Sequence, residues 1–200
     1  MKIPALWRCR YDAEYRYDRR PVGALHGIGP DRVIYGGTTS KTLASGTRLG
    51  WLVVPQHLVE PIAALRRVTD GATSTILQAT YAQFLANGDL HRYLRRSRRA
   101  YRDRRDTLLR SLRCHLPDLE PSGIAAGLNV LVHLPPGTDE AEVVSRALAA
   151  GVRVYPLAQF RAHLTANDRP GIVLGYGTVH PTHAARGVEW TVPDLVDTRS

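Results

Sequence analysis

One turn, rich in hydroxyl groups and enclosed by two apolar runs, constrains this chain more than any other segment. Residues 32–35 and 49–54 have the β-branched and aromatic composition of strands. The turn between them carries one lysine, Lys41, and ends in one arginine, Arg48. It therefore offers an amine that can attack an aldehyde, and hydroxyl, backbone and guanidinium donors for an anion. The alternative is an ordinary hairpin in which Lys41 is solvated and the hydroxyls only form the turn.

An aldehyde cofactor that carries a phosphate needs all of these groups close together. Pyridoxal 5'-phosphate is such a cofactor, and the sequence predicts Lys41 as its Schiff-base partner and as the base that moves the substrate proton. Arg48, Thr38 and Ser40 are the expected ligands of the phosphate, because a guanidinium offers a planar fork and hydroxyls add short hydrogen bonds. The alternative for Arg48 is a surface ion pair, and for the hydroxyls it is turn formation alone.

The same turn resembles the lysine region of fold-type I pyridoxal-phosphate enzymes. Residues 40–50, Ser-Lys-Thr-Leu-Ala-Ser-Gly-Thr-Arg-Leu-Gly, are most similar to the aminotransferase-like domain of the MocR/GabR group of GntR-type transcription regulators. Further segments match that domain in the same order, and together they are more specific than one short motif. These segments are residues 11–21, 88–105, 125–128, 151–154 and 174–176.

The resemblance implies an α/β fold, namely the C-terminal part of a fold-type I (aspartate-aminotransferase-like) subunit. Residues 1–88 are then expected to form the C-terminal part of the large cofactor-binding domain, with a partial sheet. Residues 89–115 form the long helix that connects the domains, residues 116–190 form a small α/β domain, and residues 191–200 form a tail. A whole subunit of this family is much longer, so we expect a truncated chain whose missing half would precede residue 1.

The resemblance also implies the partners. It predicts an amino acid or amine as substrate or effector, used for transamination or for effector sensing, and a homodimer, because fold-type I sites lie at subunit interfaces. The regulators contact DNA through an N-terminal winged helix-turn-helix, of which this sequence carries no trace. We therefore expect DNA contact only through a domain outside this chain.

Three positions around the expected site are informative. The resemblance implies that Tyr11 donates to the ring oxygen of the cofactor, although a partly buried tyrosine at a strand end fits the residue equally well. Cys9 stands where the family has the aspartate that pairs with the pyridinium nitrogen. A thiol between two arginines cannot keep that nitrogen protonated, so we expect little transaminase turnover. Val173 stands where many aminotransferases have an arginine for the substrate carboxylate.

Composition excludes several other classes of protein. The apolar fraction of 44% is ordinary for a globular chain of 200 residues, and no apolar run is long enough to cross a bilayer or to act as a signal peptide. The two cysteines, Cys9 and Cys114, lie far apart, and the eight histidines form no ligand pattern, so we expect neither a disulfide framework nor a metal site. A cytoplasmic location is the simplest expectation.

The net charge of +9 supports a second hypothesis. Clustered arginines at residues 92–113 could neutralise nucleic-acid phosphates, so the chain could be a non-catalytic remnant that contacts DNA or protein through this basic helix. The alternative is the solvated face of a long amphipathic helix, and Asp103 and Asp106 within the cluster favour it.

Hydrophobic periodicity predicts the remaining elements. Helices are expected at residues 56–69, 74–86 and 89–115, and another starts at Thr138, whose hydroxyl is expected to cap it. The continuous apolar run at 49–54 predicts a strand buried on both faces. Further strands are expected at residues 127–133, 152–155 and 171–176, with a loop at 117–123, and the family resemblance implies one more strand at residues 6–11.

Overall fold

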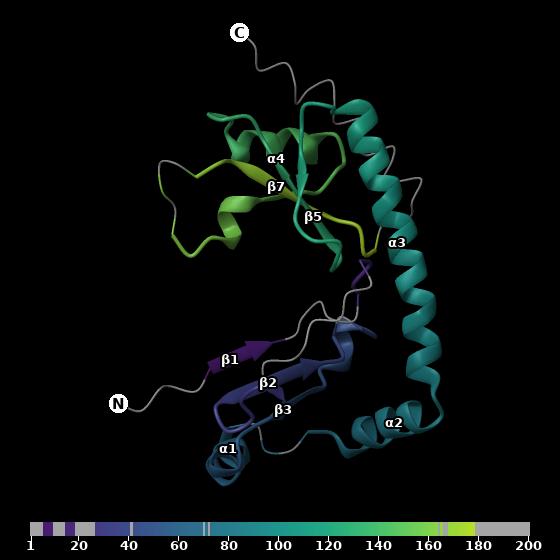
Figure 1. Ribbon diagram of the computed structural model, residues 1–200, viewed down its shortest axis with the longest axis vertical. Coiled ribbons are helices and arrows are strands. Elements are labelled where there is room, and N and C mark those ends of the chain that lie inside the picture. The colour runs from purple at the N-terminus through teal and green to yellow at the C-terminus, as the bar shows by residue number, and fades with distance from the viewer. Residues whose placement is uncertain are drawn as a thin grey trace. The chain divides into compact units, whose positions relative to one another are not determined.

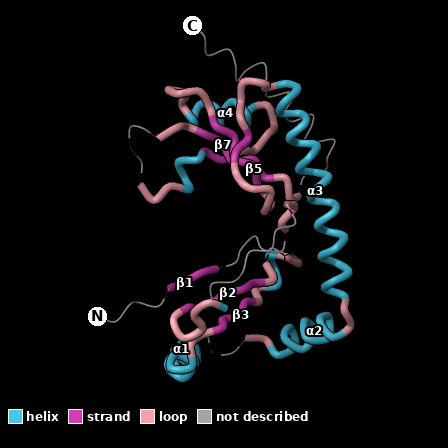
Figure 2. The backbone as a smooth tube through the Cα atoms, viewed as in Figure 1, coloured by secondary structure: helices cyan, strands magenta, loops and turns pink. Residues whose placement is uncertain are grey.

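The chain divides into two compact units, Met1–Ser97 and Arg98–Ser200. The computed structural model describes residues 6–9, 15–18, 27–40, 42–69, 71, 73–163, 165 and 168–178. Each unit combines a small sheet with helices, as Figures 1 and 2 show, and this agrees with the predicted α/β class. The expected tail at residues 191–200 lies outside the described residues.

The sheet of the first unit has the order β1-β2-β3. Its strands are β1 (Leu6–Cys9), β2 (Val33–Thr38) and β3 (Gly50–Val53). β1 runs parallel to β2, and β2 runs antiparallel to β3, so that Thr38 pairs with Gly50 at the end of the ladder. The register brings the first residue after β2 and the last residue before β3 to the same end of the sheet.

Three helices follow, and their sequence-based boundaries are confirmed to within one residue. They are α1 (Gln56–Thr69), α2 (Thr75–Ala86) and α3 (Asp89–His115). The Ser74 hydroxyl accepts a hydrogen bond from the Leu77 amide at 3.4 Å and so caps α2, which explains why this helix begins one residue after the predicted start. α3 crosses the boundary between the units and contributes residues to both.

The prediction that the third strand is buried on both faces is wrong. The strand forms, but Trp51, Leu52 and Val53 remain 40%, 44% and 41% exposed. Successive residues of a strand point to opposite faces, so both faces of β3 are open. The physical reason is position: β3 is the last strand in the described sheet, and it pairs with β2 on one side.

The second unit contains a four-stranded antiparallel sheet in the order β4-β5-β7-β6. The strands are β4 (Pro121–Ser122), β5 (Asn129–His133), β6 (Tyr155–Pro156) and β7 (Gly171–Gly175). β5 and β7 confirm two predicted strands. β4 lies in a segment predicted as a loop, and the predicted strand at 152–155 is regular only from Tyr155, because a two-residue pairing leaves almost no periodicity in the sequence.

A continuous apolar core holds this unit together. α3, β5, β7 and the helix α4 (Glu140–Ala149) all contribute fully buried side chains to it. The buried residues are Leu108, Leu109, Leu112, Leu116, Val130, Val132, Leu134, Val143, Ala147, Val154, Ile172 and Tyr176.

The cap of α4 differs from the expected one. Asp139, and not Thr138, accepts hydrogen bonds from the first free amides of the helix, those of Ala141 at 2.8 Å and Glu142 at 3.4 Å. The Thr138 hydroxyl instead donates to the Pro135 carbonyl at 2.8 Å and closes the preceding turn. A carboxylate competes better than a hydroxyl for this position because it also faces the positive end of the helix dipole.

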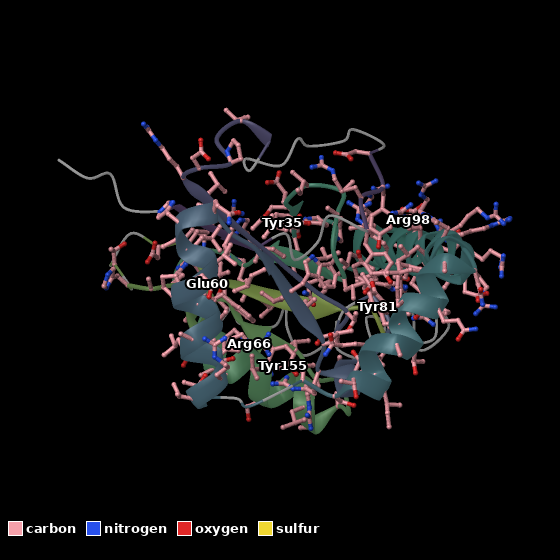
Figure 3. All side chains as sticks on the ribbon, turned by 90° about the horizontal axis from the view of Figure 1, so that it is seen from below. Tyr35, Glu60, Arg66, Tyr81, Arg98 and Tyr155 are labelled. Atoms are coloured by element: carbon pink, nitrogen blue, oxygen red, sulfur yellow. The ribbon has the colours of Figure 1, made fainter. Side chains whose placement is uncertain are left out.

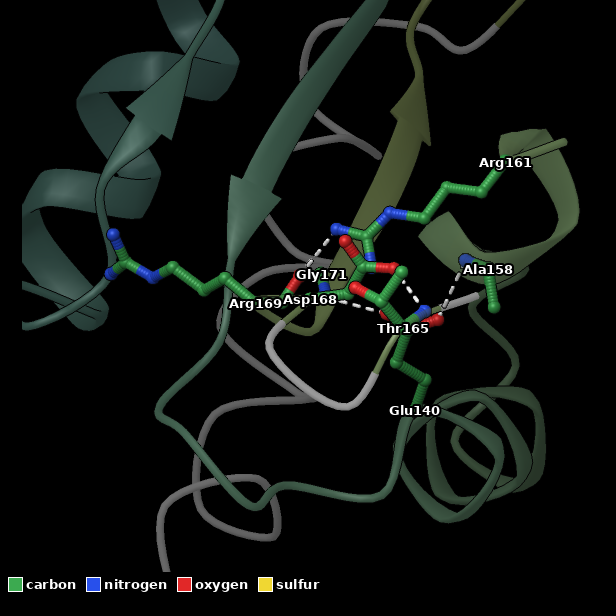
Figure 4. A network of polar contacts seen from close by, with 7 residues as sticks. All are labelled: Glu140, Ala158, Arg161, Thr165, Asp168, Arg169 and Gly171. Carbon is green, nitrogen blue, oxygen red and sulfur yellow. Dashed lines mark hydrogen bonds and ion pairs between the residues drawn. The ribbon is translucent and has the colours of Figure 1, made fainter. Parts of the chain in front are cut away.

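Glu140 ties α4 to two other elements (Figure 4). One carboxylate oxygen accepts from the Ala158 amide at 2.9 Å, in the 3₁₀ helix Leu157–Phe160, and the other accepts from the Gly171 amide at 2.7 Å at the start of β7. Charge-assisted bonds to two otherwise orphaned amides make this side chain a structural cross-link.

The loop before β7 is held by a second polar cluster (Figure 4). Arg161 donates to the Arg169 carbonyl at 2.7 Å and lies 3.5 Å from an Asp168 carboxylate oxygen. The Thr165 amide donates to that carboxylate at 2.8 Å. This backbone hydrogen bond and, after it, the charge of Arg161 hold the pKa of Asp168 below its ordinary value.

Candidate functional site

The loop between β2 and β3 is closed by a buried threonine. The Thr39 amide donates to the Leu49 carbonyl at 2.9 Å, and the Thr39 hydroxyl donates to the same carbonyl at 3.0 Å. The Thr39 and Thr47 hydroxyl oxygens lie 2.6 Å apart. Thr39 is almost fully buried, so these bonds satisfy a polar side chain that has little access to water.

Further hydrogen bonds fix the course of the loop after Ser40. The Leu43 amide donates to the Thr39 carbonyl at 2.8 Å, which forms a single helical turn. The phenol of Tyr15, 1% exposed, donates to the Thr42 carbonyl at 3.2 Å, and the phenol of Tyr93 in α3 reaches the Leu43 carbonyl at 3.5 Å. The loop backbone is therefore anchored by side chains from two distant segments.

Two of the predicted phosphate ligands, Thr38 and Ser40, lie together. Their hydroxyl oxygens are 3.0 Å apart, with Thr38 as donor, and the Ser40 amide donates back to the Thr38 oxygen at 3.1 Å. The Thr38 hydroxyl also lies 3.3 Å from the Leu49 carbonyl, so its single proton has two possible acceptors. These contacts give the pair a turn-forming role and keep both hydroxyl groups at the start of the loop.

The third predicted ligand, Arg48, has an unusual backbone. It follows the 3₁₀ helix Ser45–Thr47 with φ 47° and ψ 28°, the left-handed region that glycine prefers. Its side chain is exposed, and it makes no ion pair or hydrogen bond with another described residue. The sequence contains no acidic residue between Asp31 and Glu60, so nothing within this segment neutralises the guanidinium. The ion-pair alternative for Arg48 finds no support in the described part of the chain.

The remaining predicted site residues cannot be placed in the same way. Lys41 and Tyr11 lie outside the described residues, although Ser40 and Thr42, on either side of Lys41 in sequence, are both described. Cys9 is the last residue of β1 and pairs in register with Gly36 of β2. The structure therefore places Thr38 beside Ser40, and Arg48 in the same loop without a contact to either, and it leaves the phosphate ligands and the amine as sequence-based predictions.

Trp51 shields the strand beside this loop. A Cβ atom on Gly37 would approach the indole of Trp51 to between 2.3 and 2.6 Å, so only glycine fits under the ring. The indole also stacks on Tyr81 of α2, with ring centroids 6.3 Å apart. Figure 3 shows Tyr81 on α2 and Arg66 on α1. Gly37 of β2 thus has a packing role that the sequence alone does not reveal.

Sequence reasoning missed the residues that hold the loop in place. Thr39, Thr47, Tyr15 and Tyr93 bond to the loop, and none of them was a candidate. The hydroxyl-rich composition of the turn was a signal for the two threonines, because buried hydroxyls need partners. Nothing in the sequence links Tyr15 or Tyr93 to a carbonyl 27 or 50 residues away.

Several arginines of α3 have partners within the chain. Arg92 lies 2.5 Å from the Asp89 carboxylate, Arg104 bonds to the Gly177 carbonyl and covers the Tyr101 ring, and Arg110 donates to Thr107 at 2.9 Å. These contacts favour the amphipathic-helix interpretation over a nucleic-acid surface.

Two further expectations, that there is no metal site and no membrane-spanning helix, are compared here with the described residues alone. They contain no group of three or more histidine, cysteine or acidic side chains that could hold a metal ion. None of their helices has both the length and the apolar character needed to span a membrane.

Comparisons with known proteins agree on one family. Residues 18–170 match the family model described as aminotransferase class I and II. The chain is 31% identical over 181 residues to the uncharacterized HTH-type transcriptional regulator YhdI of Bacillus subtilis (strain 168), covering 90% of this chain and 38% of the relative. It is 33% identical over 180 residues to the probable rhizopine catabolism regulatory protein MocR of Rhizobium meliloti, covering 89% and 36%.

A solved structure extends the agreement to three dimensions. The kynurenine aminotransferase of Pyrococcus horikoshii matches with a TM-score of 0.89 at 25% identity, over 98% of this chain and 48% of that one. The predicted fold, the C-terminal part of a fold-type I subunit, is confirmed. The chain spans about half the length of this enzyme and little more than a third of the two regulators.

Proposed function

Because this chain belongs to the aminotransferase class I and II family, we propose that its β2–β3 loop binds pyridoxal 5'-phosphate. Lys41 supplies the amine that bonds covalently to the aldehyde carbon. Thr38, Ser40 and Arg48 hold the phosphate, and Tyr11 donates a hydrogen bond to the ring oxygen. The archaeal structure, described as a complex with PMP and kynurenine, supports a vitamin B6 cofactor for this fold.

The observation that carries the proposal is the donor set of the loop. The Ser40 and Thr38 hydroxyl oxygens lie 3.0 Å apart, and Arg48 has no acidic partner among the described residues. These groups suit a phosphate dianion, since a guanidinium and hydroxyls form short charge-assisted bonds to its oxygens. The buried Thr39 contacts join the two ends of the loop, which supports a loop backbone that is already formed before a ligand arrives.

Effector sensing fits this chain better than rapid turnover. When bound, the cofactor supplies an electron sink for bonds at the substrate α-carbon, and this role requires a protonated ring nitrogen. Cys9 stands at the position of the expected carboxylate partner. An amino acid or amine would therefore displace the Lys41 amine without efficient onward chemistry. The names of the two relatives, both regulators of transcription or catabolism, support this role.

The rest of the assembly follows from the same family. We propose the division into a large-domain part (1–88), a connecting helix (89–115) and a small domain (116–190), and a homodimer that acts in the cytoplasm. DNA contact would use a winged-helix domain outside these 200 residues.

A labelling experiment can assign the modified residue directly, because the chain contains only two lysines, Lys2 and Lys41. The purified protein is mixed with pyridoxal 5'-phosphate, reduced with borohydride and digested, and the phosphopyridoxyl adduct is located by mass spectrometry. The adduct is expected on Lys41, to persist in Lys2→Arg, and to disappear in Lys41→Ala. An adduct that stays at the N-terminus or Lys2 in all three proteins contradicts the proposal.

A second arm tests the phosphate ligands. Charge-assisted hydrogen bonds are worth about 1.5–3 kcal/mol each, so Arg48→Gln is expected to weaken cofactor binding about 10- to 100-fold. Pyridoxal lacks the phosphate and is expected to bind wild type and Arg48→Gln equally. If the substitution weakens both ligands alike, Arg48 acts on the loop and not on the phosphate.

A further inference from the structure

A small cavity lies within the second unit, between α3 and the strands β4 and β5. It has a volume of about 230 Å³, and its lining includes Arg105, Leu109 and Arg113 of α3, Ser122 of β4 and Asn129 of β5. We call it the α3–β4 pocket. These five residues all belong to the second unit, so the pocket is formed within one compact body. Its volume is below the roughly 300–1,000 Å³ of sites for drug-sized molecules, which favours a small ligand.

The α3 wall of the pocket has a definite order of charged and apolar side chains. Arg105, Leu109 and Arg113 follow one another at four-residue spacing, which places them on one face of the helix. Leu109 is 9% exposed and belongs to the apolar core, so this face is turned toward the sheet. The α-carbons of the two arginines lie about 12 Å apart along the helix axis. Along this face, one apolar side chain therefore stands between two cationic ones.

The positive charge of this wall has little compensation. The Arg105 side chain is 19% exposed, against 63% for Arg92 near the start of the helix, so its charge is partly withdrawn from water. Its ion-pair partner, Asp106, lies 3.7 Å from the Arg105 Nη1 atom, which is too far for a hydrogen bond. Arg113 has no ion pair or hydrogen bond with another described residue. None of the described residues that line the pocket is acidic.

Uncharged polar residues complete the lining. Ser122 and Asn129 contribute to the pocket, and neither side chain forms a hydrogen bond with another described residue. A hydroxyl and a carboxamide both carry donors, so they extend the set that the guanidinium groups provide. The alternative is that the arginine stems only cover the sheet while their charged ends stay in water. That alternative requires neither saturable binding nor selectivity for a ligand.

This order of side chains matches a ligand that has an anionic group at each end and an apolar middle. A guanidinium presents a planar fork that fits a carboxylate through two parallel hydrogen bonds. We propose that the α3–β4 pocket binds a small aliphatic dicarboxylate, whose carboxylates pair with Arg105 and Arg113 and whose methylene groups contact Leu109. Phosphate concentrates its charge at one point and offers no apolar surface to Leu109. The inference does not depend on the proposed cofactor loop, because every residue it uses lies in the second unit.

Binding is tested on the 200-residue chain with glutarate as the probe. A titration followed by two-dimensional NMR is expected to show saturable binding of one glutarate per chain. The amide signals of Gly123 and Val130, which line the pocket, are expected to shift, and those of Thr39 and Ser40 in the first unit are not. Pentanoate keeps the apolar chain but has a single carboxylate, and it is expected to bind about tenfold or more weakly, as is inorganic phosphate.

Matched substitutions assign the contacts of the two carboxylates. Arg113→Gln removes the charge of an exposed side chain outside the core, and it is expected to weaken glutarate binding by about tenfold or more. Arg105→Gln is expected to have a similar effect. Arg99→Gln makes the same change at an exposed arginine of α3 that is not among the pocket residues, and it is expected to leave binding unchanged. Circular dichroism checks that each variant keeps its helices. Lys41→Ala is expected to bind glutarate like wild type, so this test and that of the cofactor loop fail independently.

Several outcomes would overturn the proposal. One is the absence of saturable glutarate binding at millimolar concentrations. Another is equal weakening by Arg113→Gln and Arg99→Gln, which assigns the effect to the net charge of the helix. A third is phosphate or pentanoate that binds as tightly as glutarate, which removes the need for two separate carboxylate contacts. Shift changes confined to Thr39 and Ser40 would place the ligand in the loop of the first unit, with the same consequence.

Discussion

The two units are held together by different kinds of contact. The second unit buries leucines, valines and an isoleucine from two helices and its sheet in one apolar core. Among its described residues, the first unit buries few apolar side chains, Tyr15, Val33, Leu49 and Leu94, and leaves most of β3 and α1 exposed. Its loop between β2 and β3 is instead closed by hydrogen bonds of hydroxyl groups. The comparison teaches that hydroxyl hydrogen bonds can close a loop on a scaffold whose described residues bury few apolar side chains.

The largest expected contrast is between two leucines. Leu112 of α3 is 2% exposed in the second unit, and Leu112→Ala is expected to lower the stability of that unit by about 2–5 kcal/mol, since it leaves a cavity. Leu65→Ala on α1, at 60% exposure, is expected to change stability by less than about 0.5 kcal/mol. Hydrogen exchange of β5 and α1 amides measures each unit separately. Equal losses would remove the distinction.

The next effect concerns the polar loop. Thr39→Val keeps the shape of the side chain and removes the hydroxyl contacts with Leu49 and Thr47, at a cost of about 1–2 kcal/mol. The amide of Leu43, which depends on the Thr39 turn, is expected to exchange faster. Thr80→Val on α2 removes an exposed hydroxyl bond to the Ile76 carbonyl and serves as the control, with little change expected. A similar response to both substitutions would argue against a special role for Thr39.

A pair of tyrosines compares the units with the same chemistry. The phenols of Tyr15 and Tyr176, both 1% exposed, donate to backbone carbonyls, that of Thr42 in the first unit and that of Gly127 in the second. Removal of either hydroxyl by substitution with phenylalanine is expected to cost about 1 kcal/mol. Tyr15→Phe should also weaken cofactor binding, because it frees the loop, whereas Tyr176→Phe should not. Cofactor titration of both variants decides this point.

The smallest effect is a pH dependence in the second unit. The pKa of Asp168 is lowered by the Thr165 amide and by Arg161, so the ionised form stabilises the folded loop. This contribution is present above the ordinary carboxyl pKa of 3.8 and is lost as the pH falls through the lowered value. The protection of the Thr165 amide, measured as its exchange rate relative to an unstructured peptide at the same pH, is expected to fall below about pH 4, and Asp168→Asn should remove this transition. An unchanged profile in the variant would exclude Asp168 as its origin.

Much of the fold was predictable because residues close together in the sequence determine where its helices and strands form. Pro55 and the apolar spacing after it define α1, and the long leucine stripe defines α3, with the predicted ends in both cases. The exposure of β3 was not predictable, because an apolar run reports what a strand would bury and not whether a neighbour is present. The choice of Asp139 over Thr138 as a cap depends on the turn at Pro135, which a short motif does not contain.

The sequence indicated candidate site residues by their chemical type, but not the residues that hold their loop in place. Thr38, Ser40 and Arg48 were identified from residue type, and the structure places them in one loop. Thr39 and Tyr15, which hold that loop, act through long-range contacts that no spacing rule predicts. Lys41 and Tyr11 stay predictions.

The left-handed backbone of Arg48 places this position under two opposing demands. A non-glycine residue in that region costs on the order of 1 kcal/mol, which a glycine would recover. Selection for a sturdier protein would therefore favour losing the arginine, and selection for anion recognition would favour keeping it. Directed evolution for thermal tolerance alone should drift toward Arg48→Gly, and populations that must also retain the ligand should resist that drift.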